Sequence, residues 1–196
     1  MKEFIKYLFV LVLSIIIGIV VVQEIAYPTL LQYDRLARVM NRFTYTKATL
    51  TTFVTLSSWL LYFQIHRRKL SMIYLYLFYS VYLFLLFVVL FTKAPEYHQV
   101  SWAVFDFISA DKKTIMEALL NVGYFIPLGA LYAVKANYVE FVVIALLTIL
   151  GIETIQYAFY IGTFALSDIL LNFIGCWIGY ELSKFLQRKI QSPQRS

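Results

Sequence analysis

The chain has 196 residues, of which 61% are apolar and 14% are charged, whereas about 25% of the residues of an ordinary soluble domain are charged. Its mean hydropathy is +0.74 and its net charge is +6. This composition excludes a soluble enzyme, a nucleic-acid-binding domain and a disulfide-stapled secreted module. In a membrane protein the basic excess mainly sets orientation and contacts anionic lipid. The single cysteine, Cys176, permits no internal disulfide.

Six stretches lack Lys and Arg and come close to the roughly 20 residues that cross a bilayer. They are Tyr7–Val22, Ala48–Ile65, Leu70–Phe91, Ile115–Val134, Tyr138–Tyr160 and Ile161–Ser183. We therefore predict an all-α polytopic membrane helix bundle of about six transmembrane helices, forming one integral membrane domain over residues 1–196. The first stretch resembles a signal peptide, but Glu24-Ile25-Ala26 is a poor cleavage site, so we expect a retained anchor. Its removal would leave five spans.

Basic residues near the membrane predict the orientation. With the N-terminus inside, ten Lys and Arg fall on the cytoplasmic side and seven on the other. The short turn Arg67–Lys69 and the basic C-terminal tail are membrane-adjacent segments, for which the positive-inside rule is strongest. We expect both termini on the cytoplasmic side.

The first outer loop, Gln23–Lys47, has an amphipathic pattern that follows Pro28. At helical spacing the apolar residues Leu36, Val39, Met40 and Phe43 face away from Arg35, Arg38 and Arg42. This predicts a short helix in the plane of the membrane interface. It either packs over the helix ends or contacts anionic lipid or an anionic lipid-linked substrate.

Two further connections have simple interpretations. The second outer loop, Thr92–Thr114, carries Trp102, Phe105 and Phe107 and is apolar enough to lie against the headgroups. The second and third predicted helices are joined by only four residues, so we expect them to form an antiparallel hairpin.

Polar side chains inside the apolar stretches are the candidate functional residues, because an Asp near a helix centre costs about 2.5–3.5 kcal/mol on insertion scales. Glu140 and Glu181 lie close enough to the cytoplasmic helix ends to reach the headgroups. At 1.5 Å rise per residue, the others fall mainly in the outer half of the membrane. They are Glu117, Asn121, Glu153, Gln156, Asp168 and Asn172. If they face one another, they form a polar pocket open to the outer leaflet.

Helical phase places several of these residues on common faces. Asp168, Asn172, Gly175 and Gly179 share one face, and the last two form a G-x-x-x-G pair that lets a neighbouring helix approach closely. Two interpretations stay open. The polar groups either tie helices together or form a site for a substrate, a proton or a cation, as neutral hydrogen-bonded acids or as an acid pair holding an external cation.

The motifs of soluble enzymes are absent, and we expect no cofactor. The sequence has no H-E-x-x-H, no Walker loop and no G-x-S-x-G. His66 and His98 fall on opposite sides of the predicted membrane, so we expect no histidine metal site. The sequence gives little support to a hydrolase with a Ser-His pair.

Two linked blocks resemble the signature of the VanZ-like family of small integral membrane proteins. Residues Asn121–Gly129 read N-x-x-x-F-I-P-L-G, Glu153–Gln156 read E-x-x-Q, and Asp168–Tyr180 read D-x-x-x-N-x-x-G-x-x-x-G-Y. The resemblance covers residues 117–182, about a third of the chain. It implies a role at the cell envelope, in a bacterial cytoplasmic membrane of Gram-positive type, with glycopeptide resistance of the teicoplanin type as the best-known phenotype.

The chain departs from that family pattern at three positions. The family usually has an Arg and an Asp where this chain has Gly162 and Ala165, and Glu117 replaces a frequent Asn. A site that used the Arg to hold an anion would be lost here, whereas one built on Glu153, Asp168 and Asn172 would survive.

Three classes of function follow as hypotheses. The first is a non-enzymatic envelope protein whose outer-leaflet polar pocket lowers the access of lipoglycopeptides to their membrane-anchored target. The second is a membrane enzyme acting on lipid-linked envelope precursors, with Glu153 and Asp168 as acid/base pair or cation ligands. The third, a proton- or ion-coupled transporter, is least favoured because only the outer half is polar. The expected partners are the bilayer and a lipid-linked precursor or lipoglycopeptide, without nucleic acid, and the sequence leaves the oligomeric state open.

Overall fold

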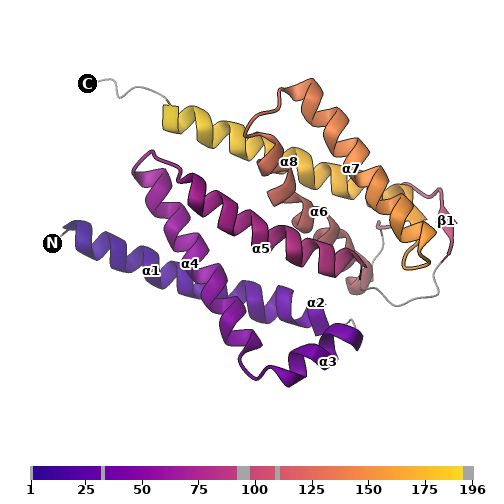
Figure 1. Cartoon of the computed structure of the whole chain (residues 1–196), viewed down its shortest axis with the longest axis horizontal. Helices are drawn as coiled ribbons and strands as arrows, with labels where there is room; N and C mark the ends of the chain where they lie inside the picture. Colours follow the sequence, from indigo (N-terminus) through magenta and orange to yellow (C-terminus); the bar gives the residue numbers. More distant parts are fainter. Residues whose placement is uncertain (1, 32–33, 92–97, 109–110, 192–196) are drawn as a thin grey trace. The chain divides into compact units, whose positions relative to one another are not determined.

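The computed structural model describes residues 2–31, 34–91, 98–108 and 111–191, and these are helical almost throughout (Figure 1). Within these described residues, five helical segments are long and apolar enough to cross a membrane. They are Ile5–Leu31, Met72–Phe91, Lys112–Tyr132, Tyr138–Ala158 and Leu166–Lys189. The predicted all-α polytopic fold is confirmed, whereas the orientation stays a prediction. The chain divides into two compact units, residues 1–80 and 81–196, and the boundary falls within one helix.

In the first unit the N-terminal helix is longer than its apolar stretch predicted. Helix α1 (Lys2–Val20) continues without a break through one turn of π-helix, η1 (Val21–Ala26), into α2 (Tyr27–Leu31). The first outer loop therefore does not begin at Gln23, and that boundary was wrong. The physical reason is that Leu30 is buried and the hydroxyl of Thr29 donates to the carbonyl of Ile25 at 2.6 Å, which satisfies a polar group inside the helix.

After α3 (Asp34–Arg42), helix α4 (Thr46–His66) packs along α1. The predicted span 48–65 is thus a helix. Its hydroxyl side chains lower its hydropathy, and it is not among the five segments given above. One of them, Thr55, is buried against Gly18, where a Cβ would overlap its Oγ1. A glycine opposite a threonine lets two helices approach closely and hides the hydroxyl from lipid.

A tight turn joins α4 to α5 (Met72–Phe91), as the short basic connection predicted. Arg68 takes the left-handed conformation with φ 51°, and the amide of Lys69 donates to the carbonyl of Gln64 at 3.0 Å. The hydroxyl of Tyr74 donates to the carbonyl of Ser57 at 2.9 Å, which holds the first turns of α5 against α4.

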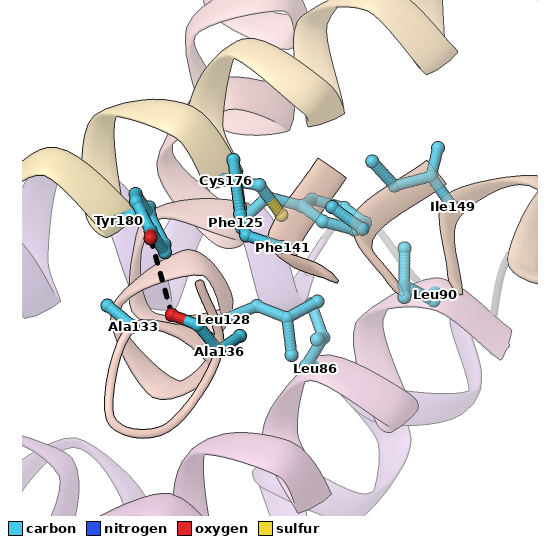
Figure 2. Packing of buried hydrophobic residues seen from close by; sticks show 11 residues of the cluster. Leu86, Leu90, Phe125, Leu128, Ala133, Ala136, Phe141, Ile149, Cys176 and Tyr180 are labelled. Carbon is cyan, nitrogen blue, oxygen red and sulfur yellow. Dashed lines mark hydrogen bonds between the residues drawn. The ribbon is translucent and has the colours of Figure 1, made fainter. Parts of the chain in front are cut away.

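The second unit contains the end of α5, strand β1 (Val100–Ser101), helices α6 (Lys112–Tyr132) and α7 (Tyr138–Ala158), strand β2 (Phe164–Ala165) and helix α8 (Leu166–Gln191). Residues 92–97 and 109–110 of the predicted second outer loop lie outside the described residues. Figure 2 shows the core, to which α5, α6, α7 and α8 all contribute. The ring of Phe141 stacks on that of Tyr180 at 4.2 Å between centroids, and the Tyr180 hydroxyl donates to the carbonyl of Ala136 at 3.3 Å.

Among the described helices, α6 and α8 make the most extensive contact, and three glycines allow their backbones to approach. A Cβ on Gly175 would overlap the backbone carbonyl of Val122, and one on Gly179 would overlap that of Ile126. In the other direction, a Cβ on Gly129 would overlap the carbonyl of Cys176. The two backbones therefore touch at three places, and only glycine fits at each.

Helix α8 begins at Leu166, so the prediction of a span from Ile161 was wrong. Tyr160 is in the left-handed conformation with φ 57°, which a helix cannot continue through. The chain then runs extended as β2, which pairs in parallel with β1 through Val100 opposite Phe164. We call the part of the second unit where α7 ends and α8 begins, beside these strands, the strand-bearing end.

Helix α6 starts at a side-chain cap that responds to pH. The Asp111 carboxylate accepts from the Thr114 amide at 3.2 Å and from the Thr114 hydroxyl at 3.1 Å. These bonds, the amide bond first, lower the pKa of Asp111 below its usual value. Because the folded-state pKa is depressed, the stabilisation is complete above the usual pKa of about 4 and disappears as pH falls through the lowered pKa.

We therefore expect the first turn of α6 to fray at acid pH. The protection of the Thr114 amide from hydrogen exchange, measured relative to its intrinsic exchange rate at each pH, should fall below about pH 4, and Asp111→Ala should show the lower protection at neutral pH as well. Unchanged exchange in the Asp111→Ala variant would contradict the capping role.

Candidate functional site

The first turns of α8 carry the two polar residues that the sequence placed on one face. Asp168 is half-buried and Asn172 is 3% exposed. The side-chain amide of Asn121, near the middle of α6, donates to Asp168 Oδ1 at 2.9 Å. Asn121 lies about 14 Å along α6 from its start. Because Asn121 is hydrogen-bonded to Asp168 in the first turn of α8, the start of α8 lies level with the middle of α6.

The last turns of α7 place two more of the candidate residues in the interior. Glu153 and Gln156 are each 2% exposed. The Gln156 amide donates to the carbonyl of Leu90 at 2.8 Å, which ties α7 to the last turn of α5. Leu90 and Ile149, one helical turn before Glu153, belong to the apolar core, so the polar residues of α7 lie next to the core, towards the strand-bearing end.

Glu117 does not lie with the others. Its side chain is 60% exposed and one of its oxygens lies 3.9 Å from Lys113 Nζ, one turn earlier in α6. We had assigned Lys113 to a loop, whereas α6 begins at Lys112 and supplies the basic partner. An exposed pair of this kind contributes little to stability.

Asn172 stands out among the polar residues of the site. Its Oδ1 is buried and accepts no hydrogen bond from any residue that the structure describes. A buried acceptor left in this state costs about 1–3 kcal/mol. Asn172 lies one turn after Asp168 on the same face of α8. The pair can accept hydrogen bonds from a donor group or hold a cation.

Sequence reasoning missed an aromatic cluster at the same end of the unit. The ring of His98 stacks between those of Tyr157 and Tyr160, at 4.0 Å and 4.2 Å between centroids, and its Nδ1 lies 3.1 Å from the carbonyl of Tyr157. This contact depends on the pairing of β1 with β2, which no periodicity signals. Ser167, also buried, was missed for want of any pattern.

The described part of the chain contains no group of three or more His, Cys, Asp or Glu that could hold a metal ion. Five of the candidate residues come from three helices and are buried or half-buried, and Asn121 and Asp168 are hydrogen-bonded to each other; the five are Asn121, Glu153, Gln156, Asp168 and Asn172. We call these five residues the polar cluster.

A family model described as VanZ/LLP1 matches residues 8–187, nearly the whole chain. The chain belongs to the VanZ/LLP1 family. The match extends the resemblance seen in α6–α8 to the N-terminal helices as well. No curated protein and no solved structure matches the chain. Family membership and the apolar helices together make it a multi-pass membrane protein.

Two of the three positions at which the chain departs from the VanZ-like pattern, Gly162 and Ala165, lie between Gln156 and Asp168 in the sequence. A Cβ on Gly162 would come within 3.1 Å of Gln156 Cβ, so a larger residue there would require Gln156 to shift slightly. Ala165 is 7% exposed and pairs with Ser101 in the short sheet. Glycine at position 162, where the family usually has Arg, leaves space for the Gln156 side chain, which donates to the carbonyl of Leu90.

The bond between Asn121 and Asp168 should be measurable in a double-mutant cycle. With Asn121→Ala and Asp168→Ala, singly and together, we expect a coupling of about 0.6 kcal/mol, and at most about 1.7 kcal/mol, as for other interhelical hydrogen bonds in membranes. Reversible unfolding in mixed micelles gives the four free energies. The exposed Glu181 serves as the control, since Asn121→Ala and Glu181→Ala should be additive. A coupling of zero between Asn121 and Asp168 would refute the bond.

Proposed function

We propose that this chain acts in a bacterial cytoplasmic membrane as an envelope protein that lowers the access of lipoglycopeptides of the teicoplanin type to their membrane-anchored target. The observation that carries the proposal is the match of residues 8–187 to the VanZ/LLP1 family. The polar cluster supports it, because carboxyl and amide groups inside a membrane protein usually mark a functional site.

The polar cluster is the region through which we propose that the protein acts. Asp168 and Asn172 lie one turn apart at the start of α8, and the buried Asn172 Oδ1 accepts no hydrogen bond from the described residues. Lipoglycopeptides and lipid-linked envelope precursors both carry amide and hydroxyl donors on a lipid anchor. With the predicted orientation, the strand-bearing end faces the outer leaflet, where such molecules lie.

Expression in a sensitive host tests the proposal. We expect the inhibitory concentration of teicoplanin to rise when the chain is produced, while that of an antibiotic with an intracellular target stays unchanged. An unchanged teicoplanin value, with the protein confirmed in the membrane, would refute it.

The alternative is a membrane enzyme that acts on lipid-linked precursors through Glu153 and Asp168. The 2% exposure of Glu153 and the bond from Asn121 to Asp168 speak against it, because a general acid or base must reach its substrate. Purified protein incubated with labelled lipid precursors, with and without divalent cations, distinguishes the two. Turnover that is lost in Glu153→Gln would favour the enzyme.

A further inference from the structure

Helix α3 follows the end of the first apolar helical segment. It follows α2 and leads into α4, and α1 and α4 pack along each other in opposite directions. A short helix that connects neighbouring ends of two antiparallel helices lies across those ends, as the first unit in Figure 1 shows. Since α1 continues as an apolar segment to Leu31, α3 begins at the boundary between hydrocarbon and headgroups.

The described side chains along α3 and just after it include one buried residue and two exposed rows, one apolar and one basic. Met40 is 7% exposed, whereas Val39 is 51% exposed and Phe43, the first residue after α3, is 65% exposed. Arg38 and Arg42 are exposed and follow the same four-residue spacing, one position before Val39 and Phe43. An apolar row and a basic row therefore run side by side on the outer surface.

This arrangement decides between the two interpretations of the amphipathic pattern. A helix that only covers the ends of its neighbours would bury its apolar residues, but only Met40 is buried among those described. The side chains of Arg35 and Leu36, part of the same pattern, lie outside the described residues. Residues 34–47 contain four basic residues and one acidic residue, so the surface attracts anions.

We propose that α3 docks on anionic phospholipids, with Val39 and Phe43 at the acyl boundary and Arg38 and Arg42 at the headgroup phosphates. Apolar residues beside basic ones are the features by which interfacial helices bind such membranes. Each basic residue near an anionic surface strengthens binding about fivefold. The docking surface uses none of the polar cluster and is independent of the proposed function.

Native mass spectrometry of the full chain, purified in detergent and offered phosphatidylglycerol or phosphatidylcholine, tests the proposal. We expect the protein to retain phosphatidylglycerol in preference to phosphatidylcholine. Arg38→Gln with Arg42→Gln should weaken that retention about 25-fold if the two residues act independently, and Arg38→Lys with Arg42→Lys should preserve it. The matched control is Lys112→Gln with Lys113→Gln, which removes the same charge from exposed positions at the start of α6.

Two results would overturn the proposal. One is unchanged phosphatidylglycerol retention in the Arg38→Gln, Arg42→Gln variant with its helical content intact. The other is an equal loss in the lysine control, which would show a general charge effect. If the double variant does not fold, Val39→Ser with Phe43→Ser keeps every charge and should still weaken retention, and full retention there would refute the docking surface.

Discussion

Glu153→Gln, Asp168→Asn and the double variant should each abolish the proposed teicoplanin resistance to the same degree, returning the inhibitory concentration to that of the host alone. Both substitutions keep side-chain size and hydrogen-bonding capacity, so they remove the acid group and little else. If the two carboxyls serve one site, the loss of either removes its function and the second substitution adds nothing. The measurement is the inhibitory concentration together with the amount of protein in the membrane.

The matched control is Glu181→Gln, an exposed acid on α8 outside the polar cluster, which should leave resistance unchanged. If the polar groups only tie helices together, Gln and Asn replace the acids without loss, because amides cross-link helices about as well as neutral acids. Near-normal resistance in the double variant would therefore favour that interpretation and contradict ours.

The sequence predicted the helices well but placed some of their ends wrongly. Apolar runs of about 20 residues identify a helix because the bilayer requires one, yet they do not mark where it stops. The helix passes Gln23 because one π-helical turn keeps the chain continuous, and it starts late at Leu166 because Tyr160 adopts a left-handed conformation. Neither feature has a periodicity that could be read from residue types.

The residues of the candidate site were likewise predicted only in part. Depth along the helices placed Asn121 and Asp168 in the same candidate set, and the structure joins these two residues by a hydrogen bond. Depth did not predict which way a side chain turns, so Glu117 was included although it pairs with Lys113 on the exposed side of α6. The stacking of His98 on Tyr157 arises from a two-residue strand pair between segments far apart in sequence, which local patterns cannot show.

Gly179→Ala and Gly175→Ala should each destabilise the protein by about 3 kcal/mol, near the upper limit for overpacked cores. The added methyl group would overlap a backbone carbonyl of α6, that of Ile126 or of Val122. A flexible side chain could rotate away, but a carbonyl within a helix moves only if α6 and α8 separate. Separation would disturb the core around Phe125 and Cys176, and it would lengthen the bond between Asn121 and Asp168.

Two glycines elsewhere in the same unit provide the controls. A Cβ on Gly123 in α6 or on Gly151 in α7 would meet no atom within 4 Å. Because alanine is the better helix former by about 1 kcal/mol, Gly123→Ala and Gly151→Ala should be neutral or slightly stabilising. Unfolding in detergent followed by circular dichroism compares the four variants. Equal stability of Gly179→Ala and Gly151→Ala would show that α6 and α8 do not touch through their backbones, since the two substitutions differ only in what the new methyl group meets.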